Sequence, residues 1–307
     1  MSHPKGAKWQ WRVTSDEEGM RLQAFLKEKC LQAPSVKSLK RAIDGKCCTV
    51  NRRIELRSSL SLKAGDTVAL SPDAFQEEDK KSAALIPLYE DGALFICNKP
   101  SGVVSENAAL RSVIPQWGKN WAVVHRLDKE TTGALIIAKT STAKEKMLAA
   151  FKERQVEKIY LAIVDGIPGK EQGKVDNSLD QVRTLHGQPV YGAVDPKKGK
   201  RAVTHWKCLK KGKNAALIWC QPITGRTHQI RVHLSGIGHP ILGDVLYGKK
   251  FRCSLQPKRN LLHAYQIQFP HPTSGKKIKV VAPIPSDFQA ALKRLEMAHP
   301  VKPLTQK

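Results

Sequence analysis

A single carboxylate, Asp128, stands beside basic residues in a short polar stretch, residues 125–133, with the sequence HRLDKETTG. Apolar runs flank this stretch, at 121–124 and 134–138, and both predict short buried strands because they are brief and β-branched. A polar loop held between two buried strands is a common place for functional groups. On this pattern alone, a surface turn with solvated charges is an equally good interpretation.

A second polar stretch, residues 222–244, contains Arg226 and three histidines. Thr227 suits the N-cap of a helix. Arg226 would then lie just before the helix N-terminus, where free amides and the dipole also favour an anion. The apolar positions at helical spacing, which would form the buried face, are Ile230, Leu234 and Ile237.

The histidines of this stretch lack the spacing of metal ligands. His228 and His233 are five residues apart and would point about 140° away from each other around a helix. His239 follows a glycine that would end the helix. The seven cysteines contain no CxxC pair, which favours free thiols over disulfides or zinc. We expect no metal site.

The composition points to a polyanionic partner. The chain has 307 residues, with 52 Lys and Arg against 27 Asp and Glu, and a net charge of +25. Nucleic acid is the first candidate partner and an anionic membrane surface the second. No apolar run approaches the roughly 20 residues of a membrane helix, and the N-terminus lacks the apolar core of a signal peptide. We expect a cytoplasmic monomer without membrane association.

Residues 12–75 predict a small α+β domain. An apolar stripe with basic edges predicts a helix within 19–31, and a second helix is expected over 36–44, capped by Ser35 and ended by Gly45. Short strands are expected at 9–13, 48–54 and 62–70. This segment resembles the S4-like RNA-binding domain through its two helices, the Val50-Asn51 hairpin and the Gly65-Asp66 turn.

Basic residues of this domain suit contact with RNA phosphates, which gives affinity without sequence choice. An ordinary solvated basic face is the alternative interpretation. The candidate RNA-binding residues are Lys37, Lys40, Arg41, Lys46, Arg52 and Arg53.

A charged stretch without apolar residues, 76–82, predicts a linker over 76–83 to a second domain over 84–297, and residues 298–307 form a basic tail. Strands outnumber helices in the second domain and mostly follow one another through short turns, which predicts an α+β fold on antiparallel sheet. Helices are expected over 142–154 and 288–297. The polar, turn-rich residues 168–200 predict a long surface excursion.

Three long motifs in the second domain together resemble the RluA-type pseudouridine synthases. They are residues 125–133, the KxYxAxVxG pattern of 158–166, and GRTHQIRVHL at 225–234. The resemblance continues through 237–248 and 261–264. The chain departs from the family at Thr132, where serine is usual, and at Ser105-Glu106, where a histidine is common. The implied fold is a mixed, mainly antiparallel sheet with flanking helices.

The resemblance implies that the chain isomerises uridine to pseudouridine in structured RNA, without a cofactor or metal. Asp128 matches the catalytic aspartate, Tyr160 the tyrosine that stacks on the target uracil, and Arg226 the arginine that pairs with the aspartate. Arg126 matches an arginine that fills the space left by the flipped nucleotide. The remaining residues expected to bind substrate are His125, Thr132, Thr227, His228, Gln229, Arg231 and Leu262.

These roles agree with the physical demands of the reaction. Flipping a uridine out of its stack costs a few kcal/mol, and stacking on an aromatic face recovers about 1–3 kcal/mol. An arginine stabilises a carboxylate in a closed pocket because it stays charged and pairs with it bidentately. Large-subunit ribosomal RNA is the favoured substrate, transfer RNA is an alternative, and a non-catalytic RNA-binding factor on the same fold is a third hypothesis. A metal-dependent hydrolase does not fit the histidine spacing.

Overall fold

The computed structural model describes residues 9–30, 35–45, 47–71, 85–111, 114, 120–185, 188–248 and 250–297. For Lys37 and Arg41 the description covers the helical backbone alone. The chain divides into two compact units, residues 1–81 and 82–307. The predicted linker 76–83, the tail 298–307 and Lys46 lie outside the described residues. Each unit is described by itself below.

Unit 1 is a small antiparallel sheet with two α-helices. Its strand order is β1-β4-β2-β3, so β1 is an edge strand as the alternating pattern of residues 9–13 predicts. The expected apolar stripe of the first helix is buried, with Phe25 and Leu26 packed in one core with Leu39 and Ile43 of the second helix. The elements are β1 (Trp9–Arg12), the 3₁₀ turn η1 (Ser15–Glu17), α1 (Leu22–Lys29), α2 (Val36–Asp44), β2 (Cys48–Val50), β3 (Arg53–Ile54) and β4 (Thr67–Leu70).

The hairpin between β2 and β3 presents basic residues to solvent. Asn51 and Arg52, its two turn residues, both have left-handed backbones, with φ of 51° and 64°. The Asn51 amide fixes this turn, because it donates to Asp66 Oδ1 at 2.8 Å and accepts from Thr67 N at 2.9 Å. Arg52 and Arg53 are exposed, as is Lys40 on α2.

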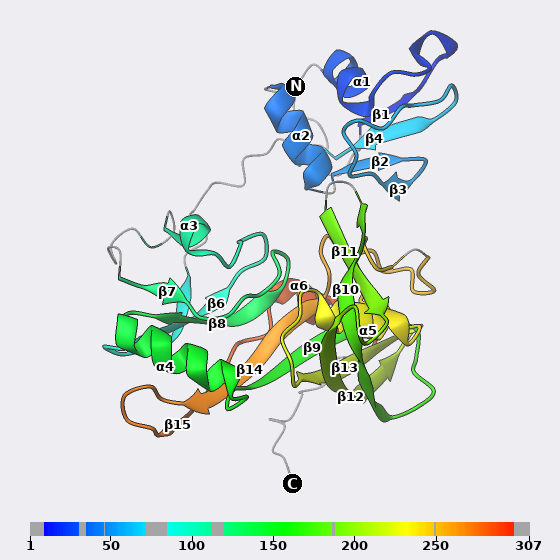
Figure 1. Ribbon diagram of the computed structural model, residues 1–307. Helices are drawn as coiled ribbons and strands as arrows, with labels where there is room; N and C mark the ends of the chain where they lie inside the picture. The colour runs from blue at the N-terminus through cyan, green and yellow to red at the C-terminus, as the bar shows by residue number, and fades with distance from the viewer. Residues whose placement is uncertain are drawn as a thin grey trace. The chain divides into compact units, whose positions relative to one another are not determined.

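Unit 2 is built on one mixed sheet, and Figure 1 shows β14 running between β8 and β9 in its middle. The strands are β5 (Ile86–Glu90), β6 (Leu94–Lys99), β7 (Ala122–Val123), β8 (Thr132–Ala138), β9 (Glu157–Asp165), β10 (Gln172–Leu185), β11 (Gln188–Val194), β12 (Lys200–Gly212), β13 (Ala215–Pro222), β14 (Leu262–Pro270) and β15 (Lys277–Val281). The helices are α3 (Asn107–Leu110), α4 (Ser141–Lys152), α5 (Gln229–Gly236) and α6 (Ser286–Arg294).

The sheet order is β11-β10-β12-β13-β9-β14-β8-β6-β5, with β15 paired to β14 and β7 to β8. Among the pairings of the described residues, β8 with β14 is parallel and the others in this sheet are antiparallel. The predicted α+β fold with a mixed, mainly antiparallel sheet is confirmed.

The helices of unit 2 cover separate parts of this sheet. Ala143, Met147 and Ala150 of α4 pack in one core with strands β6 and β8, as their helical spacing predicts. Helices α5 and α6 share the largest core with β9 and β13, to which α5 contributes Ile230 and Leu234. Strand β8 and helix α5 are therefore anchored by separate apolar clusters.

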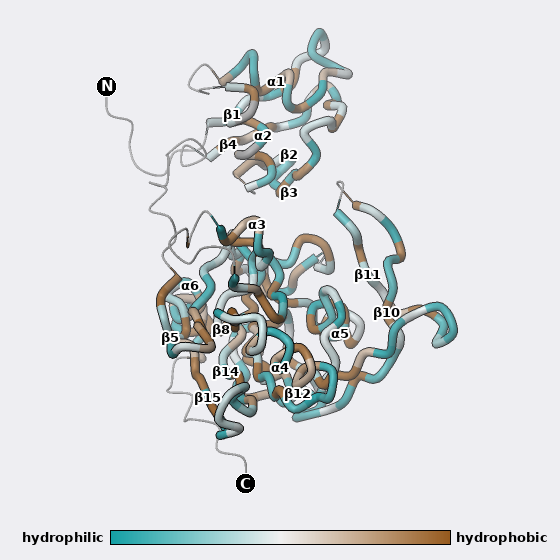
Figure 2. The backbone as a smooth tube through the Cα atoms, turned by 60° about the vertical axis from the view of Figure 1, so that its left-hand side comes forward, coloured by the Kyte–Doolittle hydropathy of each residue, from teal (hydrophilic) through white to brown (hydrophobic). Residues whose placement is uncertain are grey.

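Residues 168–200 lie mostly at the surface, as predicted, but most of them form the regular hairpin of β10 and β11, which the sequence did not indicate. Figure 2 shows the hairpin extending away from the body of unit 2 beside α5. Most residues of β10 are exposed or half-buried, so its sequence lacks the apolar alternation that marks a strand with one buried face. Backbone pairing to β11 and β12 holds the strand instead.

Candidate active site

Asp128 lies in the loop between β7 and β8, as the two flanking apolar runs predict. The loop turns tightly after the carboxylate, since Thr131 N donates to Asp128 O at 3.0 Å. Leu127, the preceding residue, is buried in the core below β8. His125 accepts a hydrogen bond from Ile136 N at 3.0 Å through Nε2, which ties the start of the loop to β8.

Lys99, the last residue of β6, and Ser105, which follows this strand, hold the loop from one side. The ammonium of Lys99 is fully buried and donates to three backbone carbonyls, those of Pro100, Val103 and Lys129, at 2.8–3.1 Å. The Ser105 hydroxyl donates to Leu127 O at 3.0 Å and accepts from Leu127 N at 3.2 Å. Ser105, which departs from the family pattern, therefore fixes the residue next to Asp128.

The end of the loop is held against β14. Glu130 accepts a hydrogen bond from Asn260 N at 3.0 Å, and Arg259 donates to the carbonyl of Glu130 at 3.3 Å. Gly133 has φ of +114°, and a Cβ at this position would lie 2.2 Å from the carbonyl oxygen of Ala264. Only glycine allows this close approach of β8 and β14.

A cavity of about 660 Å³ opens beside Asp128. Its lining includes Tyr160 from β9, Leu262 from β14 and residues of the loop and helix that follow β13. The cavity thus gathers a carboxylate, an aromatic ring and an apolar side chain from the three central strands or their ends. Such a mixture of apolar walls and few polar groups is typical of a ligand pocket.

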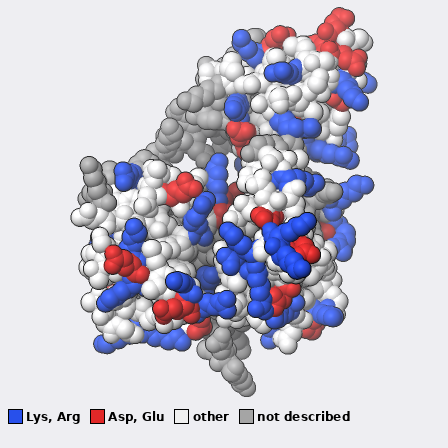
Figure 3. Space-filling view, viewed as in Figure 1, with Lys and Arg blue, Asp and Glu red and all other residues white. Residues whose placement is uncertain are grey.

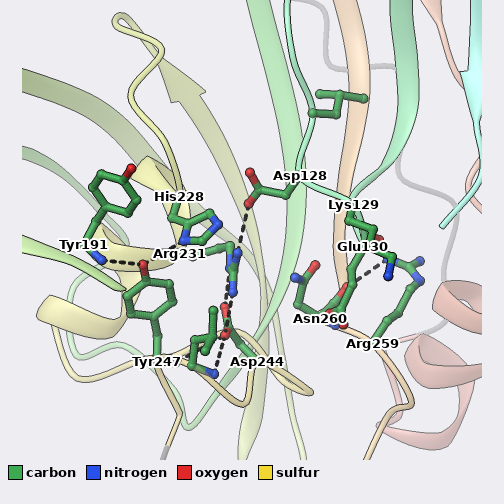
Figure 4. A network of polar contacts seen from close by, with 12 residues as sticks. Asp128, Lys129, Glu130, Tyr191, His228, Arg231, Asp244, Tyr247, Arg259 and Asn260 are labelled. Carbon is green, nitrogen blue, oxygen red and sulfur yellow. Dashed lines mark hydrogen bonds and ion pairs between the residues drawn. The ribbon is translucent and has the colours of Figure 1, made fainter. Parts of the chain in front are cut away.

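Arg231 of α5 joins the Asp128 carboxylate to a second, deeply buried carboxylate (Figure 4). Its Nη1 donates to Asp128 Oδ2 at 3.1 Å, while Nε and Nη2 donate to the two oxygens of Asp244 at 2.6 and 3.0 Å. The Asp128 side chain is 24% exposed and that of Asp244 is 1% exposed. Burial opposes the charge of Arg231, but Asp244 and then Asp128 hold its pKa above the ordinary value.

The expected pairing of Arg226 with Asp128 is wrong. Arg226 lines the cavity but is exposed, and its Nε donates to the carbonyl of Arg201 at 3.1 Å. Arg231 is five residues further on, inside a helix whose residues 229–234 are all buried. A buried arginine needs a carboxylate partner. Its place among the apolar residues of the helix, with Asp244 downstream, is the signal that could have identified it.

The ring of Tyr247 packs against the guanidinium of Arg231. The Arg231 guanidinium lies 5.0 Å from the centre of the Tyr247 ring. The Tyr247 hydroxyl accepts from Tyr191 N of β11 at 3.0 Å and hydrogen-bonds His228 Nδ1 at 2.8 Å. Figure 4 shows these side chains gathered on the α5 side of Asp128. The sequence did not indicate a role for Tyr247 or Tyr191.

The start of α5 differs from the expected Thr227 cap. The N-cap is His228, which has a left-handed backbone with φ of 56°, and Thr227 is exposed outside the cavity lining. Gln229 is buried and joins β12 to the loop after β13, because its amide donates to Val203 O and Thr204 Oγ1 and accepts from Thr224 Oγ1 and Arg226 N. Its polar groups are used within the protein.

The other expected substrate residues lie at different depths. Leu262 and His125 line the cavity, and burial lowers the pKa of His125 to about 3, so the ring is neutral. Arg126 is exposed and pairs with Glu106 at 3.1 Å. Thr132 is buried outside the cavity lining, with its hydroxyl 2.8 Å from His263 Nδ1.

The phenol of Tyr160 stays neutral. Burial, and to a smaller extent the nearby Asp128 carboxylate, raises the pKa of Tyr160 above its ordinary value.

Within the described residues, no group of three or more His, Cys, Asp or Glu side chains is arranged to hold a metal ion. Nor does any helix there have the length and apolar character needed to cross a bilayer.

Known proteins are similar to this chain over most of its length. The family model described as RNA pseudouridylate synthase matches residues 93–236. The ribosomal large subunit pseudouridine synthase D of Zymomonas mobilis is 37% identical over 70% of this chain and 74% of its own. The ribosomal large subunit pseudouridine synthase C of Vibrio cholerae is 31% identical over 93% of this chain and 96% of its own.

The fold has a close counterpart among solved structures. Human RNA pseudouridylate synthase domain containing 4 superposes with a TM-score of 0.59 at 30% identity, over 70% of this chain and 94% of that protein. The motifs, the fold and the relatives agree: this chain belongs to the RluA-type RNA pseudouridine synthases.

Proposed function

We propose that this enzyme isomerises uridines of large-subunit ribosomal RNA to pseudouridine, with Asp128 as the catalytic carboxylate. The observation that carries the proposal is the Asp128–Arg231 pair at a cavity that also exposes Tyr160. The ribosomal substrate is supported by the similar proteins, since those of Zymomonas mobilis and Vibrio cholerae are both named for the large ribosomal subunit. Transfer RNA is the alternative substrate.

Asp128 is suited to direct participation because Arg231 occupies one of its oxygens. Among the described contacts, Arg231 donates one hydrogen bond from Nη1 to Oδ2 of Asp128. Its other two nitrogens, Nε and Nη2, donate to Asp244. Asp244 thereby fixes the guanidinium, and Oδ1 of Asp128 is left for the substrate. A group held in place by such supporting contacts loses little entropy when the reaction begins.

Tyr160 and Leu262 are proposed to hold the flipped uracil. Both line the cavity with Asp128, and the ring of Tyr160 is neutral, so it offers an aromatic face without competing charge. Stacking on such a face contributes about 1–3 kcal/mol per base, which offsets part of the cost of unstacking.

Cations at the mouth of the cavity are proposed to hold the phosphates beside the target nucleotide. The exposed cations of the cavity lining are Arg126, Lys152, Arg154 and Arg226. Figure 3 shows Lys and Arg side chains gathered over the middle of the face of unit 2 that carries α4 and α5. Arg226 is therefore reassigned from the carboxylate pair to this group.

Unit 1 is proposed to add RNA affinity as an S4-like domain. Exposed Lys40, Arg52 and Arg53 support this role, and the S4-like features of the sequence agree with it. A ribosomal substrate supports a cytoplasmic location, and we propose that the enzyme acts there as a monomer.

The test is the variant Asp128→Asn, which keeps the size of the side chain and removes its charge. We expect it to abolish pseudouridine formation, measured as tritium release from RNA labelled with [5-³H]uridine, while RNA affinity stays within about twofold. Pseudouridine mapping in ribosomal RNA from cells with and without the gene identifies the site. Full turnover by Asp128→Asn would reject Asp128, and rescue of a deletion phenotype by an inactive variant would favour the non-catalytic RNA-binding factor.

A further inference from the structure

Lys158 of β9 is a half-buried cation that the proposed mechanism does not use. Its ammonium lies 3.4 Å from the carbonyl oxygen of Thr224, a long hydrogen bond. It forms no ion pair within the described part of the chain, and burial lowers its pKa to about 8. Desolvating an ammonium without a carboxylate partner is costly, so such a group suggests a ligand that completes its coordination.

The other cations around the cavity differ from Lys158 in partner or in depth. Arg231 is shared by two carboxylates, and Arg126 pairs with Glu106. Arg226 donates to a backbone carbonyl at the surface. The remaining two, Lys152 and Arg154, are exposed in solvent.

We infer that Lys158 binds a carbonyl oxygen of the target uracil and holds that ring while it is turned. The inference rests on the proposed function, because it requires a uracil stacked on Tyr160 in this cavity.

The strand geometry places the ammonium at the edge of a base stacked on Tyr160. Lys158 and Tyr160 are two residues apart on β9, so they lie on the same face of the strand and about 7 Å apart. Both side chains line the cavity. An added Cβ at Gly225 would lie 3.7 Å from the Lys158 ammonium, which locates this nitrogen beside the loop that carries Arg226. The side chain of Lys158 is long enough to reach the edge of a base whose face stacks on the Tyr160 ring.

The symmetry of uracil explains why a lysine suits this position. A half-turn of the ring about the line through N3 and C6 exchanges N1 with C5 and, at the same time, O2 with O4. A donor that contacts one carbonyl oxygen before the turn therefore meets the other carbonyl oxygen after it. Lysine is a donor without acceptor atoms, so both orientations satisfy it equally.

The ammonium would also stabilise charge that develops during the reaction. When the C1′–N1 bond breaks, its electron pair stays with the uracil and spreads over N1, O2 and O4. That pair then forms the C5–C1′ bond, after which C5 loses a proton and N1 gains one. If a nucleophile instead adds first at C6, the charge develops at O4. A donor aimed at a carbonyl oxygen in a site shielded from water lowers the barrier in either case.

A phosphate is the other oxygen that an ammonium could bind, and depth argues against it. The phosphates of an RNA strand remain at the mouth of the cavity, where four exposed cations are available. Lys158 is half-buried and lies two residues from the stacking ring on the same strand, and burial lowers its pKa.

The experiment compares Lys158→Met with Lys146→Met, a matched loss of one exposed lysine of α4 that lies outside the cavity lining. The substrate is total RNA from cells that lack the gene, labelled with [5-³H]uridine, so every RNA class is present. We expect Lys158→Met to lower the single-turnover rate of tritium release at saturating enzyme by about 10²-fold, as loss of one such donor does elsewhere. RNA affinity and its salt dependence should stay unchanged. Lys146→Met should leave the saturated rate of tritium release within about twofold of the wild-type rate.

Three results would overturn the inference. If Lys158→Met weakens binding and lowers the salt slope by about one while the saturated rate persists, Lys158 binds a phosphate. If neither quantity changes, Lys158 has no role in the substrate complex. A lower thermal midpoint of Lys158→Met, with activity restored on cooling, would indicate a structural role. Lys158→Gln serves as a second variant, because its side chain retains a hydrogen-bond donor.

The proposed function is judged separately in the same assay. Fractionation of the labelled RNA shows whether the wild-type enzyme releases tritium from ribosomal RNA or from another class. Release from transfer RNA alone would reject the ribosomal substrate and leave the Lys158 comparison intact.

Discussion

At the scale of single residues, the site is organised around a guanidinium shared by two unequal carboxylates. Arg231 gives two hydrogen bonds to the buried Asp244 and one to the partly exposed Asp128. The pair with Asp244 is structural, because both groups are almost completely buried. The single bond to Asp128 provides charge without locking the carboxylate in place.

Arg231→Gln should destabilise the protein far more than Arg226→Gln. The first change leaves Asp244 buried without its partner, which costs about 3–5 kcal/mol, whereas the exposed Arg226 should cost less than about 0.5 kcal/mol. Urea unfolding measures both. The double variant Arg231→Gln/Asp244→Asn should recover stability but not tritium release, because Asp128 still lacks its cation. Equal stability of the two single variants would contradict the described pairing.

The rate should fall at alkaline pH through Lys158. Its pKa is lowered to about 8, so the ammonium is present below that pH and is lost as pH rises through it. Lys158→Arg keeps its positive charge at all these pH values. The ratio of its rate at pH 9 to its rate at pH 7 should therefore exceed the same ratio for the wild-type enzyme. Lys99, whose pKa burial lowers to about 7, is common to both proteins and cancels in the comparison. Identical single-turnover profiles would exclude Lys158 as the titrating group.

At the scale of elements, the loops that carry function are held by side chains that reach across from neighbouring strands. The loop that carries Asp128 is fixed by Lys99 and Ser105 on one side and by Arg259 on the other. In unit 1, the Asn51 amide fixes the hairpin that presents Arg52. Each loop therefore has a fixed shape before RNA binds.

Arg52→Gly should separate stability from RNA binding in this hairpin. Arg52 has φ of 64°, a backbone that costs a non-glycine residue about 1 kcal/mol, so glycine should preserve or raise the unfolding free energy. RNA affinity should fall, and the slope of log K against log salt should decrease by about one if Arg52 contacts a phosphate. Titrations at several salt concentrations measure this, and Arg57→Gly, at an exposed residue paired with Glu55, is the control.

Sequence reasoning succeeded where local pattern decides structure. The helix over 36–44 and the strands around Asp128 follow from apolar spacing, and Asp128, Tyr160 and Leu262 do meet at one cavity. It failed for β10 and β11, whose stability comes from backbone pairing and leaves no apolar alternation. It also chose Arg226 over Arg231, because the distance to Asp128 depends on how α5 is rotated against the sheet, which the motif does not encode.

At the scale of the whole molecule, the charge of +25 governs how the enzyme meets its substrate. Exposed basic residues occur in both units, on α2 and the hairpin of unit 1 and around the cavity of unit 2. A broad positive surface accelerates encounter with RNA and contributes affinity that does not depend on sequence. Selection of the target uridine must then come from RNA shape and from the cavity.

RNA affinity should therefore depend steeply on salt. If six to ten phosphates are neutralised, the binding constant should fall by about 10³–10⁵ between 50 and 200 mM salt. Filter binding of wild type and Asp128→Asn should give the same slope, since Asp128 contacts no phosphate in the proposed complex. A binding constant that changes less than about tenfold would show that few of the basic residues touch RNA.

The tight approach of Gly133 to Ala264 has a consequence for reading mutational tolerance in this enzyme. A complete substitution scan should find position 133 as intolerant as position 128, although Gly133 carries no reactive group. Any side chain at position 133 would separate β8 from β14. It would also move the Asp128 carboxylate away from Leu262. Intolerance at this position would report a steric limit, and an activity screen alone would mistake it for chemistry.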